Sequence, residues 1–364
     1  NIHSITILSF FFLILLFPFL GILSKVNYNV EEILIFLKNS YTQRIIFFSF
    51  YQAFLSAFIS CLLAIPFALA LNRHKDHKLI RYIISLCGFS FVIPSILIVF
   101  SVIKIFGYNG ILNKYFKFYE FISIDSIYGL KAILIAHVLL NTPFATRLFV
   151  QNLNNIPKNY YEISESINLS FFGNIFKLEI PIIRQSLFAV FSIIFSLCFL
   201  SFAIVMALGG SPKNSTLEVA IFQYALFDLN FNKAVILSFV QIIICIIFVF
   251  IGFYKFKGSN FFEIGSIKYK HPHKNKILIK LIDYFLIVFF SIFLFSPVIL
   301  LYSEFLKSIF FKIELTYTFF HAFINSILIS LSTGVVVSIF GLLISYLLVI
   351  NHKNFLLQQL LFLT

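Results

Sequence analysis

Apolar segments long enough to cross a lipid bilayer recur along the whole chain, and they constrain its fold more than any other feature. A membrane-spanning helix needs about 20 mostly apolar residues. We predict spans at residues 5–23, 46–71, 79–106, 130–150, 183–208, 234–254, 281–302 and 323–350, and a further apolar run starts at Phe355. These runs are continuous, whereas the strands of a transmembrane barrel alternate over about ten residues. The sequence therefore predicts an all-α, polytopic transmembrane helix bundle.

Both ends of the chain are expected to be cuts. The first residue is Asn1 rather than Met, and Thr364 falls inside an apolar run. A signal peptide is the alternative reading of residues 5–23, but no basic segment precedes that run and no small-residue cleavage site lies near Leu23. A retained first helix in a truncated chain is therefore favoured.

Charged residues make up only 11% of the chain, against about 25% in soluble domains, and their distribution predicts a topology. The formal net charge of +13 arises from lysines and arginines that gather in alternate loops. These loops contain Arg73, Lys75, Lys78 and Arg81, then Lys158, Lys177 and Arg184, then seven lysines between residues 255 and 280. The loops between them mix both signs, as Glu218, Asp228 and Lys213 do. The positive-inside rule then predicts that the basic loops and the amino terminus are cytoplasmic. Lipid binding by residues 255–280 is the alternative to plain topology setting.

No catalytic group of residues emerges, and we expect neither an enzyme nor a bound metal or cofactor. The four cysteines lie in apolar runs at no metal-ligand spacing, which is typical of buried small residues; they are Cys61, Cys87, Cys198 and Cys245. The glycines and hydroxyls of residues 209–216 lack the order of a phosphate-binding loop. A membrane transporter with no catalytic group of its own would draw its energy from another chain or from an ion gradient. An ion-coupled carrier is weakly indicated, because His137 is the ionisable group well inside the fourth run and Asp283 lies at a helix start.

The end of the second apolar run is similar to the end of the eighth. ALALNRHKDHKLI and SYLLVINHKNFLL align when His74 is placed on His352, and Lys75 then falls on Lys353. We therefore expect two tandem homologous halves, with the second incomplete. The expected divisions are a first half at residues 1–254 with six helices, a basic cytoplasmic linker at 255–280, and the start of a second half at 281–364 with two helices and part of a third. Such repeats are typical of transporters.

Residues 157–181 read as a polar helical hairpin between two apolar runs. Ile163 and Ile167 are spaced i, i+4 with Tyr160 on the same side, which indicates an amphipathic helix. Asn168 tolerates the left-handed conformation that ends a helix, and Ser170 can cap a second helix that Pro181 closes. A rigid lever and an amphipathic hairpin on the membrane surface remain equally open from these residues alone.

The hairpin resembles the coupling loop of ATP-binding-cassette (ABC) importer permeases, in which E-A-A is followed by a glycine and a later proline. Glu162 falls on the glutamate, Ile163 and Ser164 on the alanines, Asn168 on the glycine and Pro181 on the proline. The resemblance implies a type I importer permease fold, with the coupling loop at residues 151–182 and with Ile167 among its contacts. The Ile, Ser and Asn replacements imply a bulkier loop with a stiffer turn.

Two further stretches narrow the resemblance. LLNTPFATRLFVQNLNNIP at residues 139–157 and SFAIVMALGGSPKNSTLEVAIFQ at residues 201–223 are similar to the fused, two-half thiamine-uptake permeases. The resemblance implies a multi-pass subunit of the bacterial inner membrane. Its partners would be the lipid bilayer, an ABC ATPase dimer on the cytoplasmic side that hydrolyses the ATP, and a periplasmic thiamine-binding protein. Nucleic acid is not expected as a partner.

Contacts with substrate and binding protein are predicted more loosely. Asn141 and Gln241 are polar residues inside apolar runs and are candidates for the substrate path, with helix packing as the alternative. The expected contact with the binding protein is the stretch 209–223, represented by Gly209, Gly210, Glu218 and Gln223. Ferric iron or another small solute is the alternative cargo. A carrier or membrane scaffold without an ATPase is the alternative class.

Overall fold

The computed structural model describes residues 29–90, 92–117, 127–210, 212–254, 271–274, 276–310 and 317–350, together with residues 17, 20 and 21. Every regular element in these ranges is a helix. The chain divides into two compact units, one comprising Tyr28–Tyr302 and the other Asn1–Asn27 with Ser303–Thr364.

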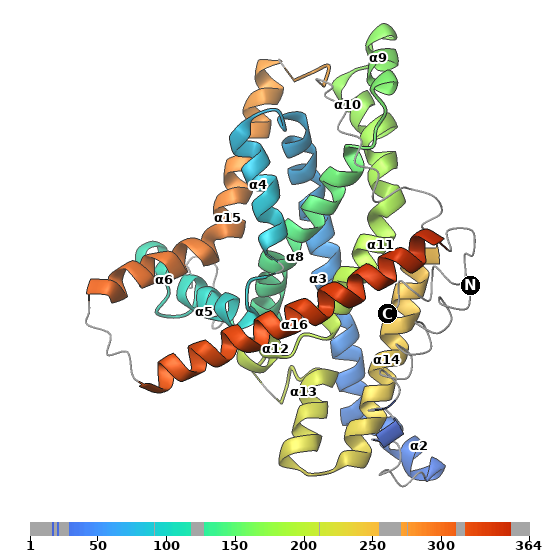
Figure 1. Ribbon diagram of the computed structural model, residues 1–364, viewed down its shortest axis with the longest axis vertical. Coiled ribbons are helices and arrows are strands. Elements are labelled where there is room, and N and C mark those ends of the chain that lie inside the picture. The colour runs from blue at the N-terminus through green and yellow to red at the C-terminus, as the bar shows by residue number, and fades with distance from the viewer. Residues whose placement is uncertain are drawn as a thin grey trace. The chain divides into compact units, whose positions relative to one another are not determined.

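Long helices form the body of the larger unit (Figure 1). They are α3 (Ser40–Arg73), α8 (Leu130–Leu153), α11 (Ile180–Phe199), α14 (Phe231–Tyr254) and the part of α15 (Ile277–Phe310) that precedes Ser303. Helix α3 packs along α8 and α11, and α14 packs along α11. Shorter helices connect them: α2 (Val30–Lys38), α4 (Lys78–Phe89), α5 (Ser95–Phe106), α6 (Ile111–Phe116), α12 (Ala203–Leu208), α13 (Leu217–Phe222) and the π-helical turn η2 (Gln223–Phe227).

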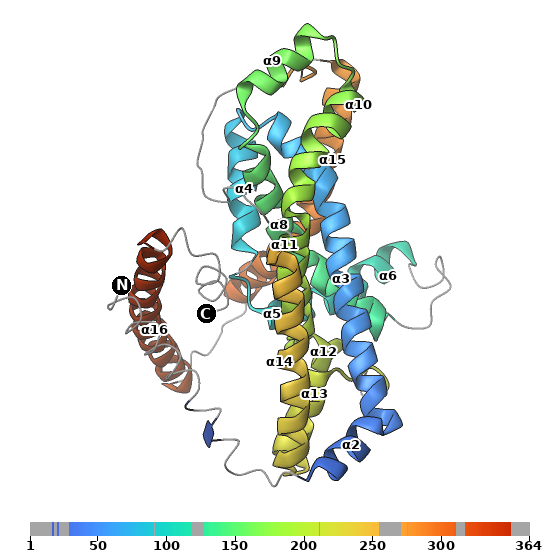
Figure 2. The same ribbon diagram turned by 90° about the vertical axis from the view of Figure 1, so that its right-hand side faces the viewer.

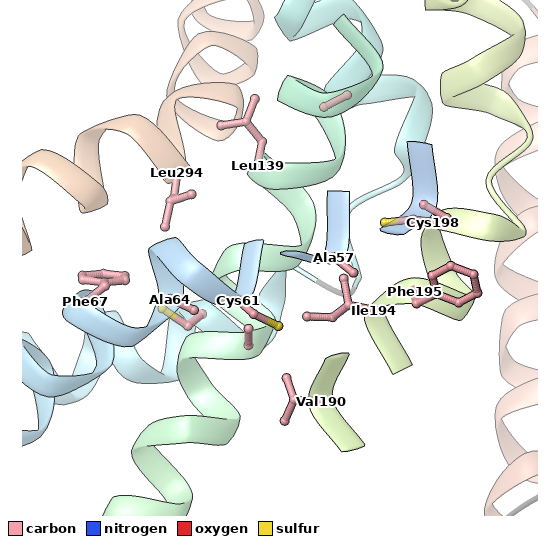
Figure 3. Packing of buried hydrophobic residues seen from close by; sticks show 14 of the residues in the cluster. Ala57, Cys61, Ala64, Phe67, Leu139, Val190, Ile194, Phe195, Cys198 and Leu294 are labelled. Carbon is pink, nitrogen blue, oxygen red and sulfur yellow. The ribbon is translucent and has the colours of Figure 1, made fainter. Parts of the chain in front are cut away.

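Small side chains on α3 allow the central helices to pack closely. Ala57, Cys61 and Ala64 are buried at helical spacing, and small residues at such positions let helix backbones approach one another. In Figure 3 Ala57 and Cys61 lie beside Ile194 of α11. Cys61 and Cys198 belong to this apolar core and are free thiols, as the sequence predicts.

Two of the predicted spans are each broken into two helices, so their prediction as single helices is wrong. Residues 79–106 form α4 and α5, separated at Ser90–Pro94, because a proline disfavours helical backbone at the residue before it and has no N–H to donate. Residues 183–208 form most of α11 and then α12, with a break between Phe199 and Ala203. Hydropathy does not mark either break, since the apolar runs continue through both.

The described residues contain seven helical segments long and apolar enough to cross a membrane, which confirms the prediction of a polytopic helix bundle. They are Ser40–Arg73, Ser95–Phe116, Leu130–Leu153, Phe171–Phe199, Phe231–Gly252, Ile277–Lys307 and Tyr317–Leu343. The last lies in α16 (Tyr317–Ile350), the long helix of the smaller unit. Most of the predicted span 5–23, the amino terminus, the run after Phe355 and the repeat partners His352 and Lys353 lie outside the described residues.

Candidate functional site

The predicted helical hairpin stands at one end of the larger unit (Figures 1 and 2). It consists of α9 (Lys158–Ser166), α10 (Phe171–Asn174) and the π-helical turn η1 (Ile175–Glu179). We call residues 158–179 the coupling segment. The N-terminal turns of α15 and the turn that joins α3 to α4 lie at the same end in both views.

A left-handed asparagine makes the turn of the coupling segment, as the sequence predicts. Asn168 has φ +49°, and the backbone N–H groups of Asn168 and Leu169 donate to the carbonyls of Glu165 and Ser164 at 3.0 and 2.8 Å. This pair of hydrogen bonds is a Schellman motif, which satisfies the last free carbonyls of α9. The hydroxyl of Ser170 then accepts from the N–H of Gly173 at 3.1 Å and caps α10.

Pro181 does not close the second helix, so that prediction is wrong. The helical backbone runs on from Phe171 through η1 into α11, and Pro181 lies in the first turn of α11. A proline inside a helix removes one backbone hydrogen bond, and a π-helical turn is one way to take up that defect. The part of the coupling segment after Asn168 is therefore continuous with a membrane-spanning helix rather than separated from it.

The apolar face of the coupling segment is exposed. The side chains on this face are exposed by 54 to 67%; they are Tyr160, Ile163, Ile167, Phe172 and Phe176. Glu162 is also exposed, and its carboxylate forms an ion pair with Lys158 at 2.8 Å. An exposed apolar face of this kind is typical of a surface that contacts a partner or a membrane.

The inward face of α9 carries hydroxyl groups. Ser164 is buried, and its hydroxyl donates to the carbonyl of Tyr161 at 2.8 Å. Tyr161 is buried too, and its hydroxyl donates to a carboxylate oxygen of Glu179 at 3.3 Å. Ser164 therefore serves packing against the bundle, whereas Glu162, Ile163, Ile167 and Asn168 face outward.

A buried ionic network lies behind the coupling segment. The guanidinium of Arg73, the last residue of α3, donates from Nη2 and Nε to the two carboxylate oxygens of Asp283 in α15, at 2.6 and 2.9 Å. His74 Nε2 lies 3.0 Å from Oδ2 of the same carboxylate. The side chains of Arg73 and Asp283 are 4% and 1% exposed. A two-pronged contact of this type is the strongest geometry that an arginine and a carboxylate form.

Glu179 extends this network into the coupling segment. Its side chain is fully buried, and Oε2 lies 3.6 Å from Nη1 of Arg73. His271, which lies in the predicted basic linker, places Nε2 3.3 Å from Oε1 of Glu179. The guanidinium carbon of Arg73 also lies 5.1 Å from the ring centre of Phe171, within the range of cation–π attraction.

Further contacts join the basic loops to one another. Lys75 Nζ donates to Asn154 Oδ1 at 2.6 Å, and Lys274 Nζ donates to Asp76 Oδ2 at 2.6 Å. His273 Nε2 lies 3.0 Å from the carbonyl oxygen of Leu169. Burial lowers the pKa of His273, and Lys276 and His271 add to that lowering. These contacts place the turn after α3, the coupling segment and residues 271–274 at one end of the bundle, as the charge pattern predicts.

The residues predicted to contact a binding protein lie in and around α12, α13 and η2. Gly210 has φ +66° and open space around its Cα, whereas a side chain on Gly209 would meet the carbonyl oxygen of Val205. Glu218 is half-buried and accepts a hydrogen bond from Gln241 of α14. Gln223 begins η2 and is half-buried. Gln241 is thus joined to Glu218, although the sequence suggests separate roles for them.

Asn141 lies in the bundle interior. Its amide donates to the carbonyl of His137 at 2.9 Å and lies 3.3 Å from the sulfur of Cys198. His137 is buried, and its Nδ1 lies 2.9 Å from the hydroxyl of Ser56 on α3. Both residues therefore link helices α3, α8 and α11, which is the packing role that polar residues commonly have between membrane helices.

The sequence analysis missed the network around Arg73. Arg73, Glu179 and Asp283 each stand at the end of an apolar run, and ionisable residues at such depths usually pair with one another. That signal marks the three residues as candidates for ion pairs. It does not identify which residue pairs with which, because Arg73 and Asp283 are 210 residues apart in the sequence.

The described helices have the fold of an ABC importer permease. The crystal structure of a bacterial alginate ABC transporter, in complex with a periplasmic protein bound to an alginate pentasaccharide, matches with a TM-score of 0.56 and 12% identity. The match covers 70% of this chain and 92% of the matched chain. At this identity the similarity establishes the fold alone, and it confirms the expected fold class. No family model matches the chain.

Sequence comparison then points to a particular kind of permease. The thiamine transport system permease protein ThiP of Haemophilus influenzae is 34% identical over 262 residues, which are 72% of this chain and 48% of that protein. The protein of the same name from Escherichia coli is 34% identical over 209 residues, 57% of this chain and 39% of that protein. Over these residues the chain is similar to the thiamine transport permeases. It spans about half the length of the curated relatives that it matches.

Proposed function

We propose that the chain forms part of the transmembrane subunit of an ATP-driven importer that carries thiamine from the periplasm to the cytoplasm across the bacterial inner membrane. The similarity to thiamine transport permeases supports the cargo. The fold supports the class. In this proposal the subunit is not an enzyme, because a separate ATPase hydrolyses ATP and a periplasmic thiamine-binding protein delivers the cargo.

The exposed apolar face of the coupling segment carries the proposal. Ile163 on α9, Ile167 directly after it and Phe172 on α10 project from the end of the bundle at which basic residues gather. A cytoplasmic ATPase that covered this face would bury apolar surface that is otherwise wet, which favours binding by about 25 cal/mol per Å². Because α10 continues into α11, a displacement of the covered face would move a membrane-spanning helix as a rigid element.

Binding of the ATPase to the full-length subunit tests the docking role. We expect Ile163→Arg to weaken this binding roughly 30-fold or more, since a buried charge at the centre of an apolar interface removes the equivalent of a hot spot. Val30→Arg is the matched control, because Val30 is 69% exposed on α2 at the other end of the unit. Equal binding by the Ile163 variant and the wild-type protein would reject docking at this face.

Uptake of labelled thiamine tests the cargo. The assay uses cells that lack their own thiamine importer and express the full-length subunit with its ATPase and binding protein. We expect uptake that unlabelled thiamine blocks and ferric iron does not. Absence of uptake by a subunit that is in the membrane and bound to its ATPase would reject thiamine and retain the importer class.

A further inference from the structure

We propose that Arg73 is a positioning residue that ties the coupling segment to α15, so that a displacement of the segment reaches α15 as well as α11. This inference rests on the proposed function for the origin of the displacement. The tie itself rests on the contacts of Arg73 with Asp283, Glu179 and Phe171.

A small cluster of buried residues joins the coupling segment to the bundle. The largest apolar side chains of α9 face outward, and its buried residues are Tyr161 and Ser164. Tyr161 reaches the Glu179 carboxylate through its hydroxyl, and its ring lies 5.4 Å from that of His271. The segment is therefore held in part at Glu179, and Arg73 is the cation that faces both Glu179 and the ring of Phe171.

Arg73 has the chemistry to hold three elements at once. It ends α3, where a positive charge is favourable at the helix C-terminus. Its planar guanidinium engages Asp283 of α15 with two N–H groups and directs the third nitrogen toward Glu179 of the coupling segment. A lysine has a single ammonium and cannot reproduce this fork. The arginine side chain therefore fixes the spacing between α3, α15 and the coupling segment.

Charge and burial favour two distinct arrangements of Glu179 and Arg73, paired or fully separated, over a continuous range of distances between them. Glu179 and Asp283 are both buried carboxylates, and either one left without a cation is strongly disfavoured in such a place. A displacement of the coupling segment would therefore carry Arg73 and Asp283 with it, or it would separate Glu179 from Arg73 completely. The first outcome moves α15, which begins the expected second half, together with α11 of the first.

Hydrogen exchange of the full-length subunit, measured without ATPase, tests the tie. The main variant is Glu179→Gln, which keeps the shape of the side chain and a partner for Tyr161 while removing the ionic contact with Arg73. We expect faster amide exchange over residues 158–174 and unchanged exchange over α8. The second variant, Arg73→Lys, keeps the charge and loses the fork, and we expect the same local effect. Wild-type exchange in both variants would overturn the proposal.

The amount of thiamine transported per ATP hydrolysed tests whether a displacement of the coupling segment reaches α15. We expect the Glu179→Gln and Arg73→Lys subunits to bind the ATPase normally and to transport roughly 2- to 30-fold less thiamine for each ATP hydrolysed, the range expected when a coupling residue is altered. Glu304→Gln is the control, since it makes the same chemical change in an exposed ion pair with Lys307. A variant that binds ATPase and transports with the wild-type ratio would overturn the proposal. Failure of the wild-type protein to bind ATPase would instead reject the proposed function, and the exchange experiment would still decide the tie.

Discussion

The turn at Asn168 shows how much one residue determines in the coupling segment. Its left-handed backbone costs about 1–2 kcal/mol for most residues with a side chain, and asparagine and glycine tolerate it best. We expect Asn168→Ala to lower the free energy of unfolding by about 1 kcal/mol and Asn168→Gly to leave it equal or higher. Thermal unfolding of the full-length subunit, followed by dye labelling of buried cysteines, measures both. An alanine variant as stable as the glycine variant would contradict the argument.

The exposed pair of Lys158 and Glu162 permits a separation of stability from function. Each side chain is about half exposed, and ion pairs of this kind contribute about 0–1 kcal/mol. Under the proposed docking, Glu162→Arg therefore leaves the unfolding temperature close to that of the wild-type protein while it lowers thiamine uptake by placing a like charge beside Lys158 and altering the docking face. Unchanged uptake by a stably inserted variant would remove Glu162 from the docking surface.

At the scale of residues, local patterns are predictable from sequence and distant pairs are not. The left-handed turn at Asn168 and the cap at Ser170 follow from side-chain chemistry within a few residues of each position. The burial of Ser164 and the exposure of Ile163 depend on which face of α9 meets the bundle, which spacing alone does not show. The pairing of Arg73 with Asp283 depends on helices brought together by the whole unit.

Helices α14 and α11 approach each other closely at Gly252. A Cβ atom there would clash with Oγ of Ser192 and would lie 3.0 Å from the carbonyl oxygen of Phe188, so α14 touches α11 at this point. We expect Gly252→Ala to destabilise the subunit by about 1–3 kcal/mol, as other overpacked cores are. Ser192→Gly in the same protein should restore part of the loss, because it removes the nearer atoms. Additive losses in the double variant, measured by thermal unfolding, would contradict close contact of the two helices.

The attachment of residues 271–274 to the coupling segment is expected to weaken in acid. Burial holds the pKa of His273 below its ordinary value of 6.5, although the carbonyl of Leu169 and the charge of Glu165 raise it. The unfolded chain then binds more protons than the folded one between the folded pKa and 6.5, so stability is lost as the pH falls through that interval. We expect the wild-type unfolding temperature to fall more between pH 7.5 and 5.5 than that of His273→Gln, which retains a donor for Leu169. Equal slopes would contradict this role.

At the scale of elements, the sequence predicts well which segments form helices. It predicts less well where those helices are broken or continuous. Apolar runs locate the long helices because length and hydropathy decide whether a segment can cross a bilayer. The breaks before Ser95 and after Phe199 and the continuous backbone through Pro181 are set by hydrogen bonding and packing, which hydropathy does not contain.

At the scale of the whole molecule, charge distribution and contacts agree on which loops share an end. Lys75, Lys158 and Lys274 lie in loops that the structure brings together through Asn154, Leu169 and Asp76. This agreement is expected, because a bundle of spanning helices has two wet ends and the positive-inside rule sorts loops between them. The expected division at residues 254 and 280 stays a prediction, with helix α15 beginning at Ile277.

Cysteine labelling determines which end faces the cytoplasm. Phe172 of the coupling segment is 67% exposed, and Lys213, in the turn between α12 and α13, is exposed at a mixed-charge loop. We expect Lys213→Cys to react with a membrane-impermeant maleimide in intact spheroplasts, and Phe172→Cys to react only after the membrane is opened. The unsubstituted protein provides the background, since Cys61, Cys87 and Cys198 are buried and the half-buried Cys245 lies within the membrane-spanning helix α14. Reaction of Phe172→Cys in intact spheroplasts would place the coupling segment outside, where no ATPase could reach it, and would reject the importer together with its topology.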